Sequence, residues 1–160
     1  RVKGLKVWPA NYNMDGQLVL AGLKADLESL VDTFKNAGAK RALVLDMSVA
    51  SHCELLESAV ENLKPYLIEF LNEEFSNVVS NVSANLYSTK DEAVELLASQ
   101  LISPVKYKQS IKAFDDKVDL FIEFGHGAVL KGLNRKISDK PTLNVSDIKT
   151  LNETLEVLND

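Results

Sequence analysis

The sequence predicts an α/β fold, and three observations support that prediction. Segments rich in β-forming residues alternate along the chain with segments whose apolar residues recur at helical spacing. Asn, Asp and Gly residues of the kind found in turns separate the two kinds of segment. The chain has 160 residues, of which 46% are hydrophobic and 26% charged, and this composition is typical of a globular domain that buries a core.

The first part of the chain predicts two strands, a helix and a third strand. Residues 6–10 and 17–21 are expected to form short strands joined by an Asn/Asp/Gly turn. Leucine, valine and phenylalanine side chains then recur at helical spacing over 23–34, and Gly38 is a typical residue just beyond a helix end. Residues 41–49 are rich in β formers and predict a buried strand.

The middle of the chain predicts two helices with an extended segment between them. One helix is expected from about Cys53, kinked or divided at Pro65. Residues 78–87 are expected to be extended. A Thr with Glu three residues later makes a capping box over 89–92, and the helix that it opens should end before Pro104.

The last part of the chain predicts a short helix, a strand and two more helices. The short helix is expected over 105–114, and alternating apolar residues over 118–124 indicate a strand. The glycines of 125–127 should make a tight turn into a helix over 128–137. From residue 146 onward, an apolar stripe at helical spacing predicts an amphipathic helix.

The composition of the chain argues against several classes of function. The formal net charge of −5 argues against nucleic acid as the main partner, and the apolar runs are too short to predict a membrane span. A single cysteine excludes an intrachain disulfide and indicates a reducing compartment, from which we expect a cytoplasmic protein. Two histidines and one cysteine are too few for a Cys/His zinc site, so no metal or other cofactor is expected.

His52 is the candidate catalytic residue, since it falls between a predicted strand and a predicted helix. Ser51 and Glu54 have capping-box spacing, which would place His52 in the first helical turn. The positive end of the helix dipole favours a neutral imidazole there, and a neutral imidazole can act as a general base. A surface histidine in a loop is the plainer interpretation, and the local spacing alone favours it.

No nucleophile can be assigned within the chain. None of its serines has glycine two positions before and two after it, so the G-x-S-x-G nucleophile turn is absent. Cys53 is adjacent to His52, but neighbouring residues in a helix do not face each other, which favours a structural role over a nucleophile. Gly125-His126-Gly127 resembles a phosphate- or carbonyl-binding turn, and a plain strand-to-helix turn explains it more simply.

Taken in order, five motifs resemble the C-terminal half of the malonyl-CoA:acyl carrier protein transacylases. The resemblance covers about residues 5–137, and five motifs in the family's order are a specific signal although each alone is modest. The motifs are Pro9-Ala10-Asn11-Tyr12-Asn13 with the Gly16–Gly22 segment, Ala37–Ala42, Val49-Ala50-Ser51-His52-Cys53, Gln100–Val105, and Ile122–Gly127 with Val129–Leu133.

The resemblance implies a more detailed fold. The family has an α/β-hydrolase-like acyltransferase body with an inserted ferredoxin-like subdomain. Residues 1–48 are similar to the second half of that subdomain, and residues 49–137 to the C-terminal part of the body. Residues 138–160 would form a C-terminal tail with an amphipathic helix.

The resemblance also implies an activity. The family transfers malonyl from malonyl-CoA to the phosphopantetheine thiol of acyl carrier protein through a malonyl-serine ester, in fatty acid biosynthesis. His52 corresponds to the base that activates the serine, and the backbone carbonyl of Gln100 to the group that orients it. Asn11 and Asn13 correspond to amides that line the cleft. No metal or other cofactor is implied, and the complete protein is expected to be a monomer.

Two departures from the family pattern matter. His126 stands where the family has proline, so it is not expected to be catalytic. The nucleophile, an oxyanion-hole glutamine and a carboxylate-binding arginine are expected upstream of Arg1, so residues 1–160 alone are expected to be inactive. A strand and a helix that would complete the subdomain sheet are also expected to be missing, and the exposed sheet edge predicts poor stability. Two alternatives stay open: a related acyltransferase for another acyl group such as methylmalonyl, which the small Ser51 would allow, and a non-catalytic carrier-protein-binding module.

Overall fold

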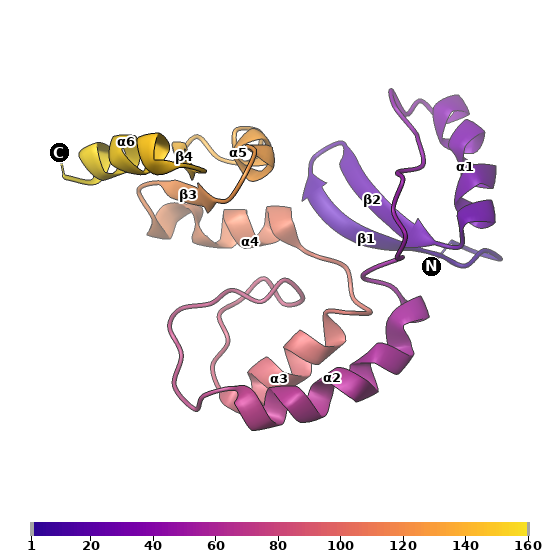
Figure 1. The fold of residues 1–160 in the computed structure, drawn as a ribbon. Helices are drawn as coiled ribbons and strands as arrows, with labels where there is room; N and C mark the ends of the chain where they lie inside the picture. The colour runs from indigo at the N-terminus through magenta and orange to yellow at the C-terminus, as the bar shows by residue number, and fades with distance from the viewer. Residues whose placement is uncertain (1, 160) are drawn as a thin grey trace.

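The computed structural model describes residues 2–159, in which short strands and helices alternate (Figure 1). In chain order the elements are β1 (Val7–Met14), β2 (Gln17–Gly22), α1 (Lys24–Asn36), the 3-10 helix η1 (Glu54–Leu56), α2 (Glu57–Phe70), α3 (Lys90–Ser99), α4 (Tyr107–Phe114), the 3-10 helix η2 (Asp115–Lys117), β3 (Phe121–Phe124), α5 (Val129–Asn134), β4 (Thr142–Val145) and α6 (Ile148–Asn159).

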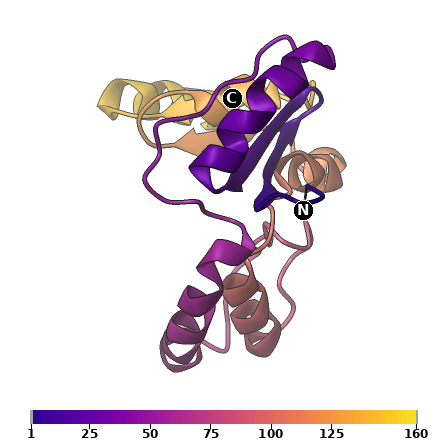
Figure 2. The same ribbon diagram turned by 90° about the vertical axis from the view of Figure 1, so that its right-hand side faces the viewer.

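The N-terminal elements form a hairpin with a helix along it. Strands β1 and β2 pair antiparallel from Val7 opposite Gly22 to Met14 opposite Gln17. The predicted turn is shorter than expected, because β1 continues to Met14 and leaves two residues between the strands. Helix α1 lies along this hairpin in both views (Figure 1 and Figure 2). The hairpin also supplies Trp8, Ala10 and Ala21 to a small core.

Helices α2 and α3 lie side by side and carry the loop that joins them (Figure 1 and Figure 2). The capping box predicted for α3 is present in part: the backbone N–H of Glu92 donates to Oγ1 of Thr89 at 3.1 Å. The Glu92 carboxylate accepts from the backbone N–H of Ser88 at 2.8 Å, where the sequence motif predicts Thr89 as its donor. The start of α3 is thus fixed by its own side chains.

The C-terminal elements form a parallel β–α–β unit. Strands β3 and β4 pair parallel, with α5 in the connection between them. Strand β4 was not predicted from the sequence, whereas α6 was. Tyr107 ties α4 to this unit, because its hydroxyl donates to Oδ1 of Asn134 at 2.7 Å and the Asn134 amide donates to Oγ1 of Thr142 at 3.2 Å. Burial, aided by the negative charge of Glu123, raises the pKa of Tyr107 to about 12.

One sequence prediction about the middle of the chain is wrong, and a second is wrong in part. Residues 41–49 form no strand, and Leu45 and Met47 are 53% and 68% exposed. A strand needs neighbours for its N–H and C=O groups, and within residues 2–159 no strand lies beside this segment. Pro65 does not divide its helix, since α2 runs unbroken through it.

The segment between α2 and α3 is only partly extended. Val79 and Leu86 form a single antiparallel bridge, and the residues between them make a turn. The prediction of an extended segment over 78–87 is therefore correct only near its two ends. Among the helices of residues 2–159, none is both long enough and apolar enough to cross a membrane.

Candidate active site

His52 lies near the end of the 37–53 segment that joins α1 to η1, and the hairpin holds this end in place. The next residue, Cys53, is 0% exposed and packs in a core with Trp8, Ala10 and Ala21 of the two strands. Its thiol also donates to the backbone oxygen of Ala50 at 3.3 Å. The buried neighbour therefore anchors the loop on the β1–β2 hairpin, which supports a structural role for Cys53.

The backbone at His52 differs from the prediction. His52 adopts a left-handed conformation with φ of 61°, and it precedes the 3-10 helix whose first flanking residue is Cys53. No side chain caps that helix, so the capping box predicted from Ser51 and Glu54 is wrong. The left-handed turn reverses the chain just before the helix and leaves the imidazole outside the first helical turn.

The imidazole reaches the end of helix α3. Its Nδ1 atom lies 2.8 Å from the backbone oxygen of Gln100. A carbonyl oxygen can only accept, so the proton of this hydrogen bond is on Nδ1. In the neutral ring, Nε2 is then the basic nitrogen, and within residues 2–159 no hydrogen bond engages it. An imidazole whose tautomer is fixed in this way can act as a general base.

The end of α3 explains why this carbonyl is available. The last carbonyls of a helix lack partners within the helix. Here the last turn changes to bonds that span three residues. The N–H of Leu101 donates to the oxygen of Ala98 at 3.3 Å, and that of Ile102 donates to the oxygen of Ser99 at 3.1 Å. The oxygen of Gln100 lies just beyond these bonds. The helix dipole also makes it a favourable acceptor for an imidazole N–H.

Asn81 is a further residue of the site that the sequence did not indicate. Its side-chain amide donates to Oε1 of Gln100 at 3.0 Å, and its backbone oxygen accepts from the N–H of Lys106 at 2.8 Å. Asn81 lies in a Ser/Asn-containing turn, so turn chemistry could have placed it in a loop. Nothing local in the sequence shows that this loop faces the end of α3.

Asn11 belongs to the strand that passes beside the segment following α3. The N–H of Val105 donates to the oxygen of Ala10 at 2.8 Å, and the N–H of Tyr12 donates to the oxygen of Val105 at 2.9 Å. Asn13 lies two residues further along the same strand. Within residues 2–159 neither asparagine makes a side-chain hydrogen bond, so the structure brings Asn11 to this region without joining either amide to His52.

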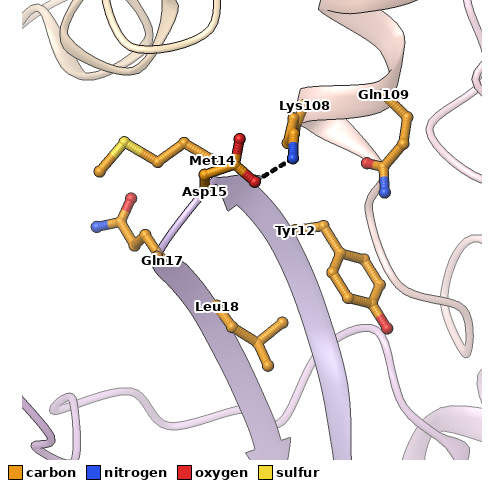
Figure 3. Close-up of a pocket in the computed structure, with 8 residues that line it drawn as sticks. Tyr12, Met14, Asp15, Gln17, Leu18, Lys108 and Gln109 are labelled. Atoms are coloured by element: carbon orange, nitrogen blue, oxygen red, sulfur yellow. Dashed lines mark hydrogen bonds and ion pairs between the residues drawn. The ribbon is translucent and has the colours of Figure 1, made fainter. Parts of the chain in front are cut away.

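A shallow depression lies at the tip of the hairpin, apart from His52. Tyr12, Met14, Gln17 and Leu18 line it together with residues of α4, and Figure 3 shows the Lys108 amine pointing at the Asp15 carboxylate. This ion pair holds the pKa of Asp15 below its usual range, chiefly through the hydrogen bond from Lys108. Asn11 and Asn13 do not line this depression.

The remaining histidine, His126, lies in the turn between β3 and α5. His126 is exposed, and it lies between two glycines with φ of 124° and 86°, so the turn needs glycine at both positions. In the part of the chain that the structure describes, no group of three or more His, Cys, Asp or Glu residues is placed to hold a metal ion.

Comparisons with known proteins identify similar chains. The sequence is 37% identical over 161 residues to the malonyl CoA-acyl carrier protein transacylase of Bacillus subtilis, covering 99% of this chain and 51% of that protein. It is 37% identical over 159 residues to the transacylase of the same name from Haemophilus influenzae, covering 98% and 51%. The chain thus spans about half the length of the curated relatives it matches. No protein-family model matches it.

Solved structures agree with the sequence matches. The malonyl-CoA:acyl carrier protein transacylase of Helicobacter pylori superposes with a TM-score of 0.93 and 46% identity, over 97% of this chain and 50% of that one. A malonyl-transacylase in complex with a type II polyketide acyl carrier protein superposes with a TM-score of 0.91 and 34% identity, over 97% and 51%. The mixed α/β arrangement of this chain is therefore that of about half of such an enzyme.

Proposed function

We propose that this chain, which shares sequence and fold with about half of the malonyl-CoA:acyl carrier protein transacylases, supplies the catalytic base of such an enzyme. One observation carries the proposal: the 2.8 Å contact between Nδ1 of His52 and the backbone oxygen of Gln100. This contact leaves Nε2 as the basic nitrogen, which is the arrangement that serine acylation requires. The reaction transfers malonyl from malonyl-CoA to the phosphopantetheine thiol of acyl carrier protein.

Each half-reaction uses His52 twice. Nε2 takes the proton of a serine hydroxyl while the serine oxygen attacks the thioester carbonyl of malonyl-CoA. The tetrahedral intermediate collapses to a malonyl-serine ester, and the imidazolium returns the proton to the departing CoA sulfur. In the second half-reaction His52 takes the proton of the phosphopantetheine thiol, whose sulfur attacks the ester carbonyl. The serine oxygen leaves and recovers its proton from His52.

Other groups of this reaction are proposed to lie outside residues 1–160. No serine here has the G-x-S-x-G surroundings of an acyltransferase nucleophile. We therefore place the nucleophilic serine, the oxyanion-hole glutamine and the arginine for the malonyl carboxylate in the rest of the protein. Asn11 and Asn13 are proposed to line the substrate cleft, an assignment supported by the backbone bonds that join β1 to Val105.

The finer architecture follows from the same proposal. Residues 1–48 would belong to an inserted ferredoxin-like subdomain, to which the hairpin and α1 contribute. Residues 49–137 would belong to the α/β-hydrolase-like body, and residues 138–160 to a tail whose β4 pairs with β3 of that body. The acceptor would be an acyl carrier protein, the partner of the similar malonyl-transacylase. The buried thiol of Cys53 fits a reducing compartment such as the cytoplasm.

Mass spectrometry of the full-length protein after incubation with malonyl-CoA tests the function. The expected result is a malonyl ester on one serine that disappears when acyl carrier protein is added. Absence of any serine ester would refute the proposal, and retained carrier-protein binding without an ester would instead indicate a non-catalytic binding module. Comparing rates for malonyl-CoA and methylmalonyl-CoA determines the acyl selectivity.

A further inference from the structure

Besides the helical bond from its N–H to the oxygen of Leu96, Gln100 makes two hydrogen bonds to distant parts of the chain. Its backbone oxygen accepts from His52 at 2.8 Å, and its side-chain Oε1 accepts from the Asn81 amide at 3.0 Å. Replacing the Gln100 side chain keeps the acceptor of the first bond, because every residue has a backbone oxygen, but it removes the second bond. The second bond ties the Gln100 side chain, just after the end of α3, to the turn that carries Asn81.

The turn that carries Asn81 is itself well determined. Ser80 is 0% exposed, and its hydroxyl oxygen accepts the N–H groups of Val82 and Ser83 at 3.1 and 3.3 Å. The Ser80 backbone pairs with Ala84 and Asn85, at 2.9 and 2.8 Å. The Asn81 side chain therefore extends from a turn held by several backbone hydrogen bonds, which makes it a firm support.

The same turn is joined to the strand that carries Asn11. The Asn81 backbone oxygen binds the N–H of Lys106, and the preceding residue, Val105, bonds to β1 through both its N–H and its oxygen. One short segment, 105–106, thus connects the Asn81 turn with β1. Displacement of Asn81 would be transmitted to Gln100 through a single side-chain bond.

We propose that Asn81 is a positioning residue for His52: its amide holds Gln100, and Gln100 in turn directs its backbone oxygen at Nδ1. This inference rests on the proposed acyltransferase function. Asn81 touches no reacting atom in this scheme. Its contribution is to keep the carbonyl, and therefore the imidazole, in one orientation.

The first experiment replaces Asn81 by Ala in the full-length protein. The rate of malonyl-serine formation in a single turnover should fall about tenfold, because small misplacements of a catalytic group are costly. The affinity for malonyl-CoA should stay unchanged, since the Asn81 amide is engaged with the Gln100 side chain. Asn85→Ala is the matched control: this asparagine is exposed in the same turn and its amide bonds only locally to Ser83.

A double-mutant cycle separates positioning from general damage. Gln100→Ala keeps the backbone oxygen and removes only the partner of Asn81, so it should slow acylation as much as Asn81→Ala. The double variant should be no slower than either single one, because both changes break the same bond. Additive losses, or a rate for Asn81→Ala equal to that of the unchanged protein, would overturn the inference.

Imidazole ¹⁵N NMR gives a readout that does not need turnover. In the unchanged protein the His52 signals should report a proton fixed on Nδ1, and in Asn81→Ala they should report a mixture of the two tautomers. Unchanged His52 signals in the variant would contradict the inference even if the protein forms no serine ester. If Asn81→Ala shows the expected tautomer mixture but the unchanged protein forms no serine ester, the positioning role stands and only the proposed function is rejected.

Discussion

The Nδ1 atom of His52 and the backbone oxygen of Gln100 lie 2.8 Å apart, although 48 positions separate the two residues in the sequence. This contact joins a loop held by the β1–β2 hairpin to the end of helix α3. Because the acceptor belongs to the backbone, its presence depends on the path of the chain and not on the amide side chain. The orientation of the imidazole therefore depends on two separate parts of the fold, the segment before η1 and the end of α3.

Replacing His52 by Ala should reduce kcat for malonyl transfer by about 10³-fold or more, since the base and acid of both half-reactions are lost. Steady-state transfer assays of the full-length protein measure this effect. Binding of acyl carrier protein should be unchanged, because the imidazole serves the chemistry. His126→Ala is the control, since His126 is exposed, and it should keep normal activity. Equal rates for the two variants would show that His52 is not the base.

The sequence predicted local features better than long-range ones. The cap at Thr89 formed because its partner Glu92 is three residues away, within one helical turn. The strand predicted over 41–49 is absent and β4 was missed, because strand formation depends on distant partners that propensity does not reveal. The role proposed for Gln100 was implied by the family resemblance. Asn81 could not be identified from the sequence, because its contact with Gln100 spans 19 positions.

Cys53 should behave as a buried structural residue. A thiol reagent should modify it only slowly in the native protein and rapidly under denaturing conditions, because it is 0% exposed. Cys53→Ala should retain malonyl transfer while lowering the free energy of unfolding by about 1–2 kcal/mol through loss of core contacts. Denaturant unfolding monitored by circular dichroism measures the second effect. Loss of the serine ester with an unchanged free energy of unfolding would argue against a structural role.

Tyr107→Phe should lower the free energy of unfolding by about 1–2 kcal/mol, because the nearly buried Asn134 loses the donor to its carbonyl oxygen. The ring remains, so packing should change little. Denaturant unfolding measures the loss, with Tyr66→Phe as a control on an exposed tyrosine. An unchanged midpoint for Tyr107→Phe would show that the Asn134 contact contributes nothing.

The same tyrosine predicts a pH dependence. Burial raises the pKa of Tyr107 to about 12 in the folded protein, above the ordinary value of about 10. Between these values the unfolded chain loses the proton while the folded protein keeps it, so the stabilisation is complete below about pH 10 and declines as the pH rises. Stability measured from pH 9 upward should fall less steeply in Tyr107→Phe. A parallel decline in both proteins would contradict the raised pKa.

Gly22 should be the least replaceable glycine of the hairpin for a steric reason. A Cβ atom there would lie 2.1 Å from the oxygen of Lys6 and 2.9 Å from Cα of Val7, so the two strands would have to separate. Gly22→Ala is expected to lower the free energy of unfolding by more than about 2 kcal/mol and to disturb the core that holds Cys53. Gly132→Ala is the matched control: it lies in helix α5 with open space around its Cβ, and should leave stability unchanged or raise it by about 0.5–1 kcal/mol. The denaturant midpoints of the two variants should differ. If both midpoints shift in the same direction, the close approach of β1 to Gly22 is not the reason that glycine is needed there.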